Sequence, residues 1–139
     1  RHLDSQSNSR MAKTDTFTLI NTTKAKLPRL AFADMKDAVL GADYDLTLTI
    51  IGTKEMQALN LAHRGIDSPT DILSFPLDDK NGEMFINPEY TKKESVNFDR
   101  SYENFFAFLF IHGLVHLKGI DHGSTMERIE ARFRKQFAV

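Results

Sequence analysis

The feature that most constrains this chain is the segment IHGLVHLKGIDHG, residues 111–123, which places three histidines close together. His112 and His116 are four residues apart, so they lie on one face of a helix on successive turns. Two imidazoles arranged in this way can both reach one metal ion at about 2.0–2.1 Å. Gly119 can adopt a left-handed conformation that ends the helix and turns the chain back, so that His122 supplies a third ligand. The spacing predicts a metal site whose fourth position is open to water or substrate.

The alternative is that these are ordinary histidines on a buried helix. Imidazoles without a polar or metal partner in apolar surroundings would cost free energy, so a common partner for the three histidines is favoured. Asp121 has two open interpretations, as an acceptor that orients an imidazole or as a turn residue. The apolar neighbours on which the argument depends are Phe105, Phe106, Phe108, Phe110, Leu114 and Leu117.

The composition limits the chemistry and the location. The chain has no cysteine, so thiolate ligands and disulfides are excluded and a transition metal must be held by histidines and carboxylates. The longest apolar run, 105–111, is far shorter than the roughly 20 residues of a membrane span. No signal peptide is recognisable, so we expect a cytoplasmic protein with no membrane partner.

The net charge of −1 argues against a chain that binds nucleic acid through overall positive charge. Any such binding would need local basic patches. The first candidate cluster is Lys24, Lys26 and Arg29, and the second is Arg128, Arg132, Arg134 and Lys135. Glu127 and Glu130 interrupt the second cluster, a pattern typical of a solvated helix face.

The length of 139 residues suits a single domain. Residues 1–10 are polar and without periodicity, and Met11-Ala12 resembles a natural start. We therefore interpret 1–10 as an artificial extension and 11–139 as one metal-binding catalytic domain.

Hydrophobic periodicity and turn residues predict an α+β fold: a single layered domain in which a small mixed sheet of about four strands packs with helices. The predicted strands are 17–20, 46–50, 71–75 and 83–86, of which the last two can pair as a hairpin. Pro76 closes the third strand and indicates either an edge strand or an abrupt end. The predicted helices are 27–40, 53–62, 102–117 and 124–137.

Three segments resemble the YbeY family of bacterial endoribonucleases. The histidines and Gly119 have the ligand spacing of metzincin proteases, but Gly113 replaces the glutamate that activates water in those enzymes. The stretch HGLVHLKGIDH is more similar to the YbeY pattern. LNLAHRGIDSPTDILSFPL, residues 59–77, resembles a second segment of that family, and GEMFI, residues 82–86, resembles a third.

The resemblance implies a zinc ion on His112, His116 and His122, a metzincin-like His-x3-His helix, and a functional arginine at Arg64. It implies cleavage of single-stranded RNA, maturation of the 3′ end of 16S rRNA and a role in ribosome quality control. It also implies ribosomal small-subunit proteins and an assembly GTPase as partners.

Glycine at position 113 has two interpretations. Gly inside a helix costs about 1 kcal/mol relative to Ala, so something must require the missing side chain. Either the helix packs closely on a strand there, or the absent carboxylate leaves room for a phosphodiester. The nucleophile stays open between water and the RNA 2′-hydroxyl.

Two other function classes compete with the ribonuclease. The histidine spacing favours a metalloprotease, which the glycine at 113 opposes. A non-enzymatic ribosome-assembly factor with structural zinc is the other alternative.

Overall fold

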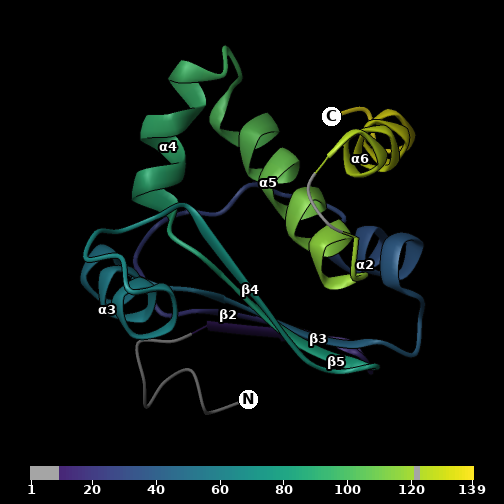
Figure 1. Ribbon diagram of the computed structural model, residues 1–139, viewed down its shortest axis with the longest axis horizontal. Coiled ribbons are helices and arrows are strands. Elements are labelled where there is room, and N and C mark those ends of the chain that lie inside the picture. The colour runs from purple at the N-terminus through teal and green to yellow at the C-terminus, as the bar shows by residue number, and fades with distance from the viewer. Residues whose placement is uncertain (1–9, 121–122) are drawn as a thin grey trace.

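The computed structural model describes residues 10–120 and 123–139, which form one mixed sheet and five helices (Figure 1). The strand order is β1-β2-β3-β5-β4. The strands are β1 (Arg10–Lys13), β2 (Phe17–Asn21), β3 (Asp45–Ile50), β4 (Ile72–Asp78) and β5 (Asn81–Ile86). The helices are α2 (Phe32–Leu40), α3 (Thr53–Arg64), α4 (Pro88–Asn97), α5 (Tyr102–Leu117) and α6 (Ser124–Gln136).

The predicted α+β class is confirmed, with one strand more than expected. The central strands β2, β3 and β5 are parallel, and β1 and β4 run antiparallel at the two edges. The additional strand is β1, which begins at Arg10, one residue before the predicted domain start. Met11 pairs with Ile20 in this strand, a contact that the short polar sequence around it did not indicate.

The helix α4 was also missed. Its start has a recognisable signature, because Asn87 accepts a hydrogen bond from the Tyr90 backbone N–H at 2.7 Å and Pro88 occupies the first turn. Its side chains are mostly polar, so it lacks the apolar periodicity on which the prediction relied.

Two predicted boundaries are wrong. The first helix begins at Phe32 instead of Leu27, because the Asn21 side chain holds the preceding loop by donating to the Ala25 carbonyl at 3.0 Å. Strand β4 continues through Pro76 to Asp78. Proline is tolerated there because β4 is an edge strand, one of the two predicted possibilities, and its missing N–H breaks no inner ladder.

The two faces of the sheet are covered differently. Leu46, Leu48 and Ile50 of β3 are fully buried on the face that packs against α2, α5 and α6. The alternate side chains of β4 and β5 pack with α3 on the other face, where Met56 and Leu73 are buried. Figure 1 shows α5 running across the sheet, with α6 beside it and α3 at the opposite end of the sheet. Helix α5, which carries the predicted ligands His112 and His116, is therefore packed along one face of the sheet.

Helix α5 is strongly apolar but has only 16 residues. Within the described part of the chain, no helix combines the length and hydropathy that crossing a bilayer requires.

Candidate metal centre

The histidine helix has the predicted bounds. Ser101 caps its start by accepting a hydrogen bond from the Asn104 backbone N–H at 3.0 Å. His112 is half-buried and His116 is exposed, so both lie on the side of α5 that borders solvent. Beyond the helix, Gly119 has a φ of 91°, the left-handed conformation predicted for the bend. The third predicted ligand, His122, and its neighbour Asp121 lie outside the described residues.

A carboxylate from the next helix orients His112. Glu130 Oε2 of α6 lies 2.8 Å from His112 Nδ1, and the Glu130 side chain is almost fully buried. An Nδ1–H that donates to this carboxylate would place the ring's lone pair on Nε2, the tautomer usual for a metal-ligating histidine. Arg134 Nη1 lies 3.4 Å from the other carboxylate oxygen. The position of Glu130 therefore suits an imidazole that donates through Nδ1, as a metal-ligating histidine does.

The sequence interpretation of Glu130 as part of a solvated face was wrong. In α6, the buried residues are Met126, Glu130 and Phe133, spaced four and three residues apart. The signal that could have identified it is a carboxylate inside the apolar stripe of an amphipathic helix. Such a residue needs a polar partner, and the structure supplies two, His112 and Arg134.

Close packing accounts for Gly113. A Cβ atom at this position would lie 2.7 Å from Met84 Cε, 2.9 Å from Ile72 Cδ1 and 2.9 Å from Ser74 Oγ. Position 113 therefore faces the sheet, where α5 approaches β4 and β5. Of the two interpretations, the structure supports the packing one, and a side chain here would point into the sheet.

Comparison with known proteins decides the family. The family model described as Endoribonuclease YbeY matches residues 6–138. The chain belongs to this family. The match covers nearly the whole chain and includes the histidine helix, α3 and β4, so it confirms the resemblance seen in three separate segments.

Individual YbeY relatives agree. The chain is 34% identical over 108 residues to the Endoribonuclease YbeY of Alkaliphilus metalliredigens, covering 70% of each chain. It is 40% identical over 83 residues to that of Campylobacter jejuni, covering 56% of this chain and 62% of the other. The solution structure of TM1509 from Thermotoga maritima superposes with a TM-score of 0.58 at 24% identity, covering 76% of this chain and 78% of that one. This last likeness supports the fold.

The residues present fit a zinc ion of the kind expected in a YbeY protein. Two histidines share one helix face, and a buried carboxylate orients one of them. Among residues 10–120 and 123–139, no three histidine or carboxylate side chains form a complete ligand set. The third ligand predicted by the spacing, His122, lies outside these ranges.

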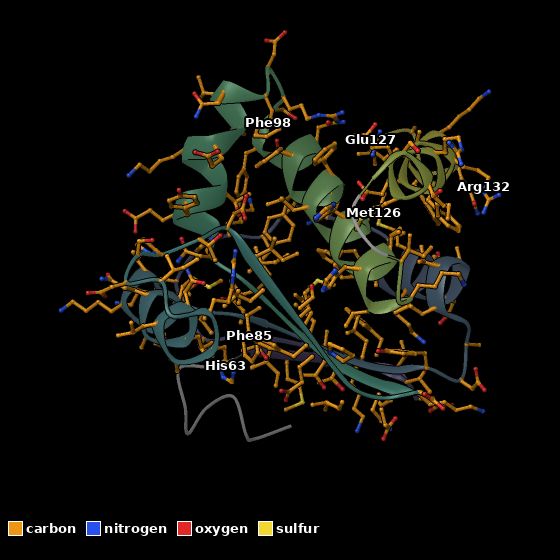
Figure 2. All side chains as sticks on the ribbon, in the orientation of Figure 1. His63, Phe85, Phe98, Met126, Glu127 and Arg132 are labelled. Atoms are coloured by element: carbon orange, nitrogen blue, oxygen red, sulfur yellow. The ribbon has the colours of Figure 1, made fainter. Side chains whose placement is uncertain are left out.

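The predicted functional arginine of the YbeY resemblance lies on a different element. Arg64 is the last residue of α3, and its side chain is exposed. Gly65 ends this helix with a φ of 70°. The preceding His63 packs against Phe75 of β4 with ring centroids 4.7 Å apart and the rings tilted by 43°. Figure 2 shows His63 on α3, away from α5. The catalytic role of Arg64 stays a prediction.

Strand β4 connects these two regions. Ser74 lies against Gly113 on one face, while Phe75 packs with His63 and Phe85 on the other. At the start of the strand, burial raises the pKa of the Asp71 carboxyl above its ordinary value of 3.8, and hydrogen bonds from Ile72 and Thr70 partly offset this. The strand is thus a wall between the histidine helix and α3.

Proposed function

We propose that the chain is a zinc-dependent endoribonuclease that hydrolyses single-stranded RNA. The observation that carries the proposal is the buried Glu130 bonded to His112, one helical turn from His116, in a member of the YbeY family. A metal-ligating histidine usually donates its second ring N–H to a carboxylate, a backbone carbonyl or water, and the Glu130 contact supplies such a partner. The family to which the chain belongs is described as an endoribonuclease, which supports RNA as the substrate.

Each residue has a defined task in this proposal. His112, His116 and His122 would hold the zinc ion, which supplies a Lewis acid for phosphodiester hydrolysis when bound. Glu130 would orient the His112 ring by accepting a hydrogen bond from Nδ1–H, so that Nε2 faces the zinc ion. Arg64 would donate hydrogen bonds to the phosphoryl oxygens, whose planar bidentate geometry suits a guanidinium.

The biological setting is also part of the proposal. We place the activity in the cytoplasm, in maturation of the 3′ end of 16S rRNA and in ribosome quality control. Ribosomal small-subunit proteins and an assembly GTPase are the proposed partners. The support for these points is the family resemblance of the three sequence segments.

The test compares RNA with protein as substrate. The purified chain, loaded with zinc, is incubated with an unstructured RNA oligonucleotide and separately with casein. We expect endonucleolytic RNA fragments and intact casein. Cleaved casein would indicate a metalloprotease, and stoichiometric RNA binding without turnover would indicate an assembly factor.

Arg64→Ala tests the proposed catalytic arginine in the same assay. We expect RNA cleavage to fall by about a hundredfold or more, the effect typical of removing one group that stabilises transition-state charge. Lys54→Ala, an exposed cation in the first turn of the same helix, is the matched control and should cleave as wild type does. Unchanged cleavage in Arg64→Ala, with zinc content retained, would remove Arg64 from the mechanism.

A further inference from the structure

A hollow between α5 and α6 opens next to the candidate metal centre. Its volume is about 530 Å³, and its lining residues are Phe108, Ser124, Glu127, Arg128, Glu130, Ala131 and Arg134. Glu130 in this wall is the residue bonded to His112, and Phe108 lies one helical turn before His112 on α5. The hollow therefore lies beside the site where RNA cleavage is proposed.

Two guanidinium groups converge on one aromatic ring in this hollow. The Arg100 Cζ atom lies 4.4 Å from the centroid of the Phe108 ring, and the Arg134 Cζ atom lies 5.0 Å from it. Each contact is a cation–π interaction. Burial and the positive charge of Arg134 lower the pKa of Arg100, so the two cations lie close enough to repel each other. A pair of like charges held together on a scaffold is suited to binding an anion between them.

The charges around Phe108 favour an anionic ligand. Arg128, Arg134 and two carboxylates, Glu127 and Glu130, line the hollow, and Arg100 contacts the Phe108 ring. Glu130 is already engaged by His112 as well as by Arg134, so it neutralises the arginines only in part. Figure 2 shows Glu127 on the side of α6 that faces α5, whereas Arg132 of the same helix points away from it.

An aromatic stack continues from Phe108 to the surface. Phe105 lies 5.7 Å from Phe108 between ring centroids and 4.8 Å from Phe98, in each case with nearly parallel rings. Phe98, in the connection between α4 and α5, is 50% exposed (Figure 2). An exposed ring beside a cationic groove is the combination with which proteins bind single-stranded nucleic acid, because every base has a face that can stack.

We propose that this arginine–phenylalanine groove, defined as Arg100, Arg128, Arg134, Phe108 and Phe98, binds the single-stranded RNA that flanks the scissile phosphodiester. The guanidiniums contact backbone phosphates, and Phe98 stacks on a base further along the strand. This inference rests on the proposed ribonuclease function. It also predicts the path of the RNA, which runs from the histidines along α5 toward the N-terminus of that helix.

The test measures RNA affinity and its salt dependence. The probe is a fluorescent single-stranded 2′-O-methyl phosphorothioate RNA, which resists cleavage, bound to the zinc-loaded protein. The double variant Arg100→Gln/Arg128→Gln leaves Arg134 in place, because Arg134 also contacts Glu130. We expect about tenfold weaker binding and a shallower slope of log affinity against log salt, by about 0.7 for each phosphate that the variant no longer neutralises. Phe98→Ala should weaken binding without changing this slope.

Arg132→Gln is the matched control, since Arg132 is exposed on the opposite side of α6. It should keep wild-type affinity and slope. Wild-type affinity and slope in the double variant, in a protein that still cleaves RNA, would overturn the groove alone. Absence of both RNA binding and cleavage in the wild type would overturn the proposed function, and the groove with it. Equally tight binding of a polyglutamate peptide, abolished in the same double variant, would assign the groove to an acidic protein and contradict the proposal.

Discussion

At the scale of single residues, Glu130 links the helix that carries the histidines to the helix that follows them. We predict that Glu130→Gln lowers the zinc affinity of the chain by about 10- to 100-fold, because a neutral amide holds the His112 ring less firmly and makes it a weaker base. Competition with a chromophoric chelator measures this directly. Glu127→Gln, an exposed residue of the same helix, should bind zinc as wild type does. Equal affinities in all three proteins would exclude the orienting role.

Gly113 is predicted to be required by packing. The added methyl of Gly113→Ala meets Met84, Ile72 and Ser74 at less than 3.0 Å, which costs about 1–3 kcal/mol in a well-packed interior. The better helix propensity of alanine returns about 1 kcal/mol, so we expect a net decrease of about 1 kcal/mol in the free energy of unfolding. Urea denaturation measures it. In a Met84→Ala background the decrease should shrink or reverse, and an equal decrease in both backgrounds would argue against this contact.

Because the Asp71 carboxyl is partly buried, we predict that the free energy of unfolding depends on pH. Burial raises its pKa in the folded chain above 3.8, so the folded state binds this proton more tightly than the unfolded state does. Stability from this group is therefore present below pH 3.8 and is lost as pH rises through the folded pKa. Asp71→Asn, which mimics the protonated form, should gain stability over wild type at pH 7 and lose that gain toward pH 4. A difference that stays constant with pH would contradict the shift.

At the scale of elements, a buried lysine fastens the end of α2 to the sheet. Lys36 is fully buried, and its Nζ donates to the Tyr44 carbonyl at 2.7 Å and to Thr16 Oγ1 at 2.8 Å. It also forms an ion pair with Asp37 at 2.7 Å. We predict that Lys36→Met costs about 3 kcal/mol of unfolding free energy, since it leaves buried oxygens without their donor. Lys93→Met, exposed on α4, should change stability by less than about 0.5 kcal/mol. Similar midpoints of chemical denaturation for both variants would show that Lys36 does not stabilise the contact between α2 and the sheet.

Elements with strong apolar periodicity were predictable from sequence. The bounds of α5 match the prediction because Ser101 caps it and its core residues recur at helical spacing. The alternation of Leu46, Leu48 and Ile50 also located β3. Strand β1 and helix α4 were not predictable in this way, since pairing with β2 and a cap at Asn87 define them, not an apolar pattern.

At the scale of the whole molecule, the fold brings together contacts that no local pattern contains. The sequence alone predicts that His112 and His116 share one helix face, because a single helix sets their spacing. Glu130 is 18 residues from His112 in the chain, so its contact depends on how α6 packs on α5. The position of Arg64 relative to the histidines depends in the same way on the packing of α3 against β4.

The central claim is that one zinc ion bound through α5 makes the chain a ribonuclease. The most direct test measures zinc content and RNA cleavage together, on wild type and on His116→Ala purified by the same steps. We predict that the wild-type chain binds one zinc ion and cleaves RNA. A folded His116→Ala protein should lose both the zinc ion and the cleavage. Cleavage that persists in the zinc-free variant, or that disappears from wild type on repurification, would contradict it.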